Sequence, residues 1–128
     1  MKRWSWLLIP LPVFAHMVSM STGELRVDGT RAEYELRIPS YEVAHVHEPD
    51  HTLLEHIHFR SGGSVGKLVQ KNCEDQRGTY ICSATYDFPA PVDVLDVDCT
   101  FASITVPNHV HLLHAYKGDK SDQAVFDL

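Results

Sequence analysis

The sequence predicts an all-β fold: an antiparallel, immunoglobulin-like β-sandwich of about seven strands, with one histidine-rich loop and a short helix. The main observation is that apolar and polar side chains alternate along most of the chain, which is the period of a half-buried strand. Turn residues separate these segments at regular spacing, as in antiparallel sandwiches. With 128 residues, of which 44% are hydrophobic, the chain is long enough for one domain with a buried core.

The first two predicted strands form a hairpin around Asp28-Gly29, a dipeptide that favours tight turns. Leu25 and Val27 alternate with polar residues before this turn. After the turn, apolar residues alternate with charged ones at Ala32, Tyr34, Leu36 and Ile38. A hairpin with one apolar face follows from this pattern.

The remaining predicted strands show the same alternation. They cover residues 65–72, 80–88, 95–101, 110–116 and 123–128. The clearest apolar face is formed by Tyr80, Cys82, Ala84, Tyr86 and Phe88. Asp96 and Asp98 alternate with apolar residues, so we interpret them as part of a solvated strand face rather than as an acid–base pair.

Residues 40–58 break this alternation. Thr52 and Glu55 have the spacing of a capping box, in which two side chains satisfy free N–H groups at the start of a helix. We therefore predict one helical turn there, within a loop that crosses one end of the sandwich and carries many of the histidines. Loops on a rigid sandwich commonly hold binding sites.

Residues 1–15 have the order of a secretory signal peptide: Lys2 and Arg3, then an apolar run, then the small residue Ala15. A membrane anchor is the alternative, but two prolines interrupt the run, and it is shorter than the roughly 20 residues of a spanning helix. We expect cleavage after Ala15 and an exported domain of residues 16–128, either periplasmic or extracellular.

The charge balance is acidic, since 11 lysines and arginines against 17 aspartates and glutamates give a net charge of −6. Removal of the basic signal peptide would make the exported part more acidic still. Nucleic acid and anionic lipid are disfavoured as partners because they are themselves negatively charged. An acidic surface instead suits cations.

Three cysteines in an exported chain predict one disulfide and one free thiol. Cys73 and Cys82 would face each other across a hairpin that turns between Gln76 and Gly78, and we predict this pair. Pairing of Cys82 with Cys99 fits the register equally well. In the predicted pairing, Cys99 is a small buried apolar residue, since it alternates with apolar neighbours.

Nine histidines are the strongest functional signal, because imidazole is a common metal ligand and also titrates near neutral pH. His109 and His111 are two apart on a predicted strand, so their imidazoles share one face about 6 to 7 Å apart. We treat this pair as exposed ligands that contribute little to the core. His114 has the opposite parity and points away. His56 and His58 form a second His-x-His pair.

These residues predict an extracytoplasmic domain that binds a divalent transition metal, either nickel, copper or zinc. Such a site needs at least three histidines from separate segments to converge. Cleavage would also make His16 the first residue, whose α-amine and imidazole can chelate a copper-like ion; this resembles the histidine brace of copper proteins. The candidate ligands are His16, His45, His47, His56, His58, His109 and His111.

The sequence contains neither Gly-x-Ser-x-Gly nor His-Glu-x-x-His, the motifs of common hydrolases. We therefore predict that the protein is not an enzyme. A mononuclear copper enzyme at His16 is one alternative. The other is a noncatalytic structural or interaction domain whose histidines sense pH.

Several segments together resemble the exported amino-terminal domain of HupE/UreJ-type proteins, over most of residues 16–128. They are Ala15-His16 and residues 20–27, 41–45, 106–113 and 118–120. The resemblance implies metal uptake or handling beside a membrane permease, since permeases of that family are associated with nickel or cobalt entry. It also implies that the protein continues into a helical membrane part after Leu128. The alternative is that the last predicted strand is a short edge strand at which the domain ends. Transport itself is not implied for the residues present.

Overall fold

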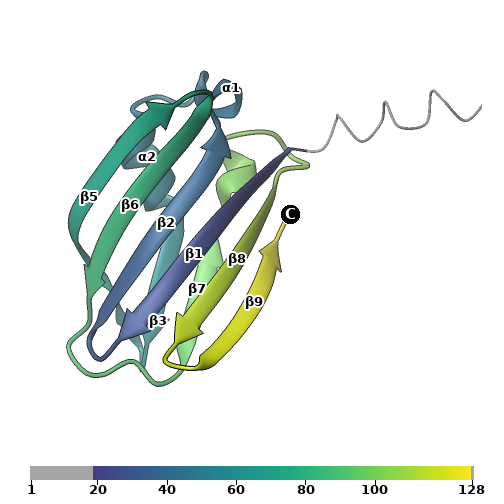
Figure 1. Ribbon diagram of the computed structural model, residues 1–128. Helices are drawn as coiled ribbons and strands as arrows, with labels where there is room; N and C mark the ends of the chain where they lie inside the picture. The colour runs from purple at the N-terminus through teal and green to yellow at the C-terminus, as the bar shows by residue number, and fades with distance from the viewer. Residues whose placement is uncertain (1–18, 128) are drawn as a thin grey trace, which may run out of the picture.

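The computed structural model describes residues 19–127, which form two β-sheets with short helices at one end (Figure 1). The first elements are β1 (Met20–Asp28), β2 (Arg31–Pro39), α1 (Ser40–Val43), α2 (Pro49–Glu55), β3 (Ile57–Ser61) and β4 (Ser64–Val65). They are followed by β5 (Lys67–Gln76), β6 (Thr79–Asp87), β7 (Leu95–Cys99), the 3-10 helix η3 (Phe101–Ser103), β8 (Val110–Lys117) and β9 (Lys120–Phe126). The predicted mostly-β fold is confirmed. The predicted signal peptide and His16 lie outside the described residues.

The large sheet has six strands in the order β5-β6-β2-β1-β8-β9, and the small sheet has three in the order β4-β3-β7. The large sheet lies in front of the small sheet in Figure 1, with α1 and α2 near its upper end. Buried and exposed residues alternate along β1 and β2, so one face of the large sheet forms the core. Within residues 19–127, no helix has the length and apolar character needed to cross a membrane.

The expectation of a wholly antiparallel sandwich is wrong for one pair of strands. β1 and β8 are parallel, with Met20 opposite Val110. The cause is the path of the chain: β7 belongs to the small sheet, and the segment after it returns to the end of the large sheet where β1 begins. There the Val110 N–H donates to the Ser19 carbonyl at 2.9 Å. Parallel strands need a long connection of this kind.

The segment expected to be only a loop and a short helix also contains the start of the small sheet. α2 begins three residues before the predicted capping box, with Pro49 in its first turn and no side-chain cap. Proline suits that position because its fixed φ is helical and the first N–H groups lack partners in any case. Thr52 therefore lies inside the helix, where its hydroxyl donates to the His47 carbonyl at 2.6 Å. The capping box was the wrong interpretation.

The core lies between the two sheets and is centred on aromatic side chains. Phe59 of β3 packs edge-on against Tyr34 of β2 at 5.2 Å and against Tyr86 of β6 at 5.0 Å between ring centroids. Edge-to-face packing of this kind favours a fixed spacing of the two sheets. The small sheet therefore covers the middle strands of the large sheet.

The predicted disulfide is confirmed. Cys73 and Cys82 lie opposite each other in the β5–β6 hairpin, with a Cα–Cα distance of 4.0 Å, and are bonded. The turn places Arg77 and Gly78 at positive φ, which glycine adopts readily. Cys99 is the free thiol among the described residues, as expected, but it is only partly buried against the core, whereas a buried position was predicted. Burial raises its pKa to about 11, so the thiol is protonated at neutral pH.

Candidate functional site

The buried histidine pair lies on the inner face of the large sheet. His109 directly precedes β8 and His111 is the second residue of this strand, and each side chain is only 1% exposed. The predicted shared face is confirmed. The expectation that this pair is exposed is wrong, because the face that it shares is the one that continues into the core with Leu113.

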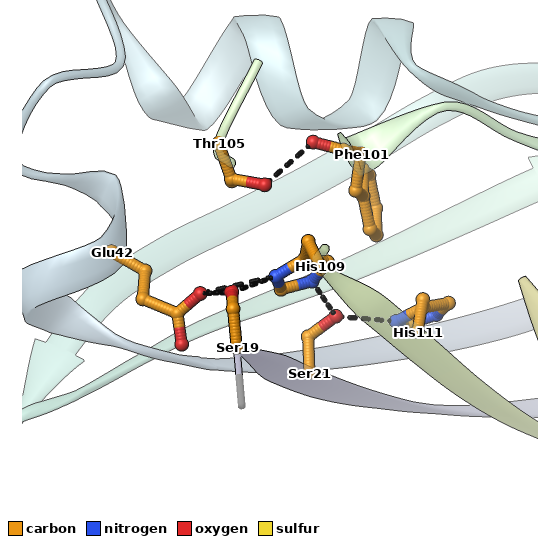
Figure 2. A network of polar contacts seen from close by, with 7 residues as sticks. All are labelled: Ser19, Ser21, Glu42, Phe101, Thr105, His109 and His111. Carbon is orange, nitrogen blue, oxygen red and sulfur yellow. Dashed lines mark hydrogen bonds and ion pairs between the residues drawn. The ribbon is translucent and has the colours of Figure 1, made fainter. Parts of the chain in front are cut away.

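A chain of hydrogen bonds runs through both imidazoles (Figure 2). The Glu42 carboxylate of α1 lies 3.0 Å from Nδ1 of His109, and the Ser21 hydroxyl lies 2.8 Å from Nε2 of the same ring. Ser21 continues to Nδ1 of His111 at 2.7 Å. The Tyr34 hydroxyl lies 3.0 Å from Nε2 of His111. All four ring nitrogens therefore have partners from the protein.

Ser19 completes the outer end of this chain. Its hydroxyl donates to Oε1 of Glu42 and lies 2.5 Å from Nδ1 of His109, so the Nδ1–H of His109 can be shared between the serine and the carboxylate. The second carboxylate oxygen, Oε2 of Glu42, is buried and has no hydrogen-bond partner within residues 19–127. Oε1 of Glu42 contacts both Ser19 and His109.

One assignment of protons satisfies the whole chain with both imidazoles neutral. His109 donates from Nδ1 to Glu42, and Ser21 donates to Nε2 of His109. His111 donates from Nδ1 to Ser21, and Tyr34 donates to Nε2 of His111. A serine hydroxyl has one hydrogen and two lone pairs, so Ser21 can donate to Nε2 of His109 while it accepts from Nδ1 of His111.

The local sequence positions this network through strand register. Ser21 of β1 lies opposite His111 in the parallel pair with β8. Gly23 is the next inward residue of β1, and a Cβ atom there would lie 2.7 Å from Cε1 of Tyr34 and 2.8 Å from Nε2 of His111. Glycine therefore leaves the space in which the tyrosine and the imidazole meet.

Aromatic rings seal the network from solvent. Phe101 of η3 packs edge-on against His111 at 4.8 Å and against His109 at 6.4 Å between centroids. The hydroxyl of Thr105 donates to the Phe101 carbonyl at 2.8 Å, which holds the turn that carries this ring (Figure 2). Phe126 of β9 stacks on His111 at 6.4 Å.

This enclosure determines the protonation of the inner half of the chain. Burial, and secondarily the neighbouring imidazole of His109, lowers the pKa of His111 to about 3. Burial also raises the pKa of Tyr34 well above its usual value of 10. At neutral pH, His111 is therefore an uncharged imidazole and Tyr34 an intact hydroxyl donor.

The structure does not bring the other predicted ligands to this pair. His45 and His47 are exposed between α1 and α2, where Nε2 of His47 lies 3.2 Å from Glu48. Nδ1 of His56 lies 2.9 Å from the Thr100 hydroxyl. Within residues 19–127, no group of three or more histidine, cysteine, aspartate or glutamate side chains is placed to hold a metal.

The second His-x-His pair faces away from the core. His56 and His58 alternate with the buried residues Ile57 and Phe59, so they lie on the outer face of the small sheet. Nδ1 of His58 lies 3.8 Å from the Asp98 carboxylate, and both side chains are about half exposed.

Sequence reasoning missed the partners of the buried pair. Ser19, Ser21 and Gly23 continue the inward positions of Leu25 along β1, so an extended alternation could have revealed them. Glu42 carries no such signal, because it comes from a four-residue helix that is distant in sequence.

The chain matches no protein-family model, and it matches no curated protein sequence. The site must therefore be interpreted from its own geometry.

Proposed function

We propose that this protein is a noncatalytic structural or interaction domain whose buried histidines make its fold sensitive to acid. The observation that carries this proposal is the closed chain Glu42–His109–Ser21–His111–Tyr34, in which each imidazole nitrogen already has a partner. Buried imidazoles that are engaged in this way favour a structural role, because a ligand would have to displace existing hydrogen bonds.

The two ends of the chain differ in charge. His109 faces the carboxylate of Glu42, whereas His111 has no acidic neighbour among its hydrogen-bond and ring partners within residues 19–127. Those partners are Ser21, Tyr34, Phe101, Phe126 and His109. A proton added to His111 would therefore have no counter-charge among these partners. Such a buried, uncompensated charge is strongly unfavourable.

Acid should consequently destabilise the domain. Below about pH 6.5 the unfolded chain binds a proton at His111, but the folded chain does so only near pH 3. Over this window the unfolded state binds more protons, so the free energy of unfolding falls as pH falls. For one group the slope approaches about 1.4 kcal/mol per pH unit. The hydrogen bonds of the buried network, which this loss of stability would weaken, join β1, β2, β8 and α1.

The test is urea unfolding across this pH range with two matched variants. His111→Asn keeps a group near the Ser21 hydroxyl but does not titrate, and His58→Asn removes an exposed imidazole. We expect the acid-dependent loss of stability to be smaller in His111→Asn than in the unaltered protein, and unchanged in His58→Asn. Parallel pH profiles for all three proteins would contradict the proposal.

Export is a second part of the proposal. The disulfide between Cys73 and Cys82 is compatible with an oxidising compartment, and residues 1–15 carry the signal-peptide pattern. We propose a periplasmic or extracellular location with His16 as the first residue. Mass spectrometry of the exported protein should show this terminus, and an intact Met1 in that fraction would contradict it.

Metal binding is the second candidate function, and one observation favours it. Oε1 of Glu42 and Nδ1 of His109 lie 3.0 Å apart, while Oε2 of Glu42 has no partner among the described residues. Carboxylate and imidazole are both ligands of zinc, copper and nickel. Metal uptake beside a permease, as the HupE/UreJ-type resemblance implies, stays a prediction.

Calorimetry with Zn²⁺, Cu²⁺ and Ni²⁺ on the correctly processed protein tests this candidate. If the buried pair binds the metal, a His109→Asn/His111→Asn variant should lose tight binding, whereas His56→Asn/His58→Asn should keep it. Equal metal affinities in both variants would show that the buried pair does not bind the metal.

A further inference from the structure

We infer that the open edge of β7 binds an extended segment of a partner protein as a fourth strand of the small sheet, and that this strand has apolar residues facing inward and basic residues facing outward. The inference names a partner class for the proposed interaction domain and rests on that role. Its test is made near neutral pH and is independent of the acid response.

The backbone of β7 offers the first argument. The Thr100 N–H donates to the His56 carbonyl at 2.8 Å, and this pair continues the register in which Ile57 lies opposite Cys99. Hydrogen-bonded and non-hydrogen-bonded pairs alternate in an antiparallel ladder. The residues of β7 that turn their N–H and C=O groups away from β3 are therefore Leu95, Val97 and Cys99. No strand within residues 19–127 pairs with that side.

An apolar groove next to this edge offers the second argument. It has a volume of about 510 Å³ and lies between β7 and the inner face of β8 and β9. Its apolar lining includes Val27, Leu95, Val97, Leu113 and Ala124. Ala124 is on the inner face because it lies opposite buried Leu113 in the β8–β9 ladder. Side chains from an added strand would cover these residues.

The arrangement of the two sheets around the open edge of β7 favours a single strand, rather than a second folded domain, as the occupant. In Figure 1 the small sheet ends at β7, behind β1 and β8, whereas the large sheet continues to β9. The outer strands of the large sheet therefore overhang the edge of β7. Neighbouring strands are about 4.8 Å apart and packed sheets about 10 Å apart, so one further strand beside β7 would lie beneath β8 and β9. A second copy with its own large sheet would collide with this overhang.

The negative charge of β7 indicates that the outward-facing residues of the partner strand are basic. Asp96 and Asp98 are exposed and lie on the outer face of the small sheet, opposite Arg60 and His58 of β3. An added strand would bring its own outward residues next to these carboxylates from the other side. Opposite charges on neighbouring strands stabilise the pairing. Lysine or arginine at alternate positions therefore fits, and the net charge of −6 adds long-range attraction for a basic segment.

This binding mode is strand addition, in which main-chain hydrogen bonds supply affinity and alternate side chains supply specificity. A segment of about the length of β7, which has 5 residues, is enough to pair along the whole edge. Its inward side chains would be small or branched apolar residues, since they must fit into the groove against Ala124 and Leu113.

The test uses a blocked peptide of about eight residues in which valine and lysine alternate. We expect it to bind, and to slow hydrogen exchange at the amides of Leu95, Val97 and Cys99. A peptide with glutamate in place of lysine should bind about tenfold more weakly. An Asp96→Lys/Asp98→Lys variant should reverse this preference.

Two variants of β9 separate groove binding from nonspecific attraction. Ala124→Phe fills the groove from an exposed edge strand and should weaken the valine–lysine peptide about tenfold or more. Val125→Phe places the same ring on the opposite face of β9 and should leave binding unchanged. Since neither position is buried, both variants should fold.

Three outcomes would overturn the inference. The first is the absence of groove-specific binding, seen either as no binding of the valine–lysine peptide or as equal weakening by the two β9 variants. The second is slow exchange at the Leu95, Val97 and Cys99 amides in the isolated processed domain, which would show that the chain itself covers the edge. The third is self-association that Ala124→Phe abolishes, which would identify a second copy as the occupant. The acid response of the fold would stand in each case.

Discussion

The two His-x-His pairs of this chain have the same spacing but opposite environments. His109 and His111 face the core, where each is 1% exposed and every ring nitrogen has a protein partner. His56 and His58 face solvent on the outer side of the small sheet. The spacing fixes that the two rings of a pair share a face, but it does not decide which face is buried.

The neighbouring residues decide this. His109 and His111 are followed at the same parity by Leu113 and Ala115, which belong to the core or pack against it. His56 and His58 instead alternate with the core residues Ile57 and Phe59. A histidine pair in phase with the apolar residues of its strand is therefore interior, and one out of phase is exterior.

The largest effect that separates the two pairs should come from double substitution by alanine. We expect His109→Ala/His111→Ala to lose roughly 3 to 5 kcal/mol of unfolding free energy, because it leaves a cavity and deprives buried Ser21, Glu42 and Tyr34 of partners. Urea unfolding near neutral pH measures this loss.

The matched control is His56→Ala/His58→Ala, which should lose less than about 1 kcal/mol because its contacts are partly exposed. Similar losses in the two double variants would mean that the difference in burial has no energetic consequence, and would break the comparison.

A smaller effect should follow from Gly23→Ala, which tests the packing of the interior pair without removing either imidazole. The new Cβ would lie under 3 Å from both Tyr34 and His111, so we expect a loss of about 1 to 3 kcal/mol. Thr22→Ala, at the adjacent exposed position of β1, is the control. Equal thermal stability of the two variants would show that the tyrosine and the imidazole do not need this space.

The smallest effect concerns the exterior pair and its acidic neighbour. His58→Asn should change the free energy of unfolding by less than about 0.5 kcal/mol, since the contact between His58 and Asp98 is 3.8 Å long and about half exposed. Thermal unfolding in low and high salt measures it. A loss above about 1 kcal/mol would place His58 in a structural role like that of the interior pair.

Much of the strand pattern could be predicted from the sequence because period-two alternation is a local property. The β1–β2 hairpin and the Cys73–Cys82 pairing both follow from residues close together in the chain, where a turn fixes the register. The prediction was weakest where alternation was interrupted. Alternation does not reveal the strand Ile57–Ser61, because only His56 separates it from the helix and its first residues fall within the histidine-rich segment 40–58.

The rest depends on contacts between distant segments. Nothing in the alternation of residues 110–116 says that the strand pairs in parallel with β1, yet this pairing brings Ser21 to His111. The contact of Glu42 with His109 likewise joins residues that are far apart in the chain. The histidines could therefore be identified as candidates, but their partners could not.

The most direct test of the account is nitrogen NMR of the imidazole rings between about pH 8 and pH 4. We expect His111 to stay neutral throughout this range because burial lowers its pKa to about 3. Its proton should be on Nδ1, which faces the Ser21 hydroxyl, because Nε2 accepts from Tyr34. A His111 ring that gains its proton near pH 6.5 would contradict a buried network that disfavours the charged imidazole, and with it the proposed acid response.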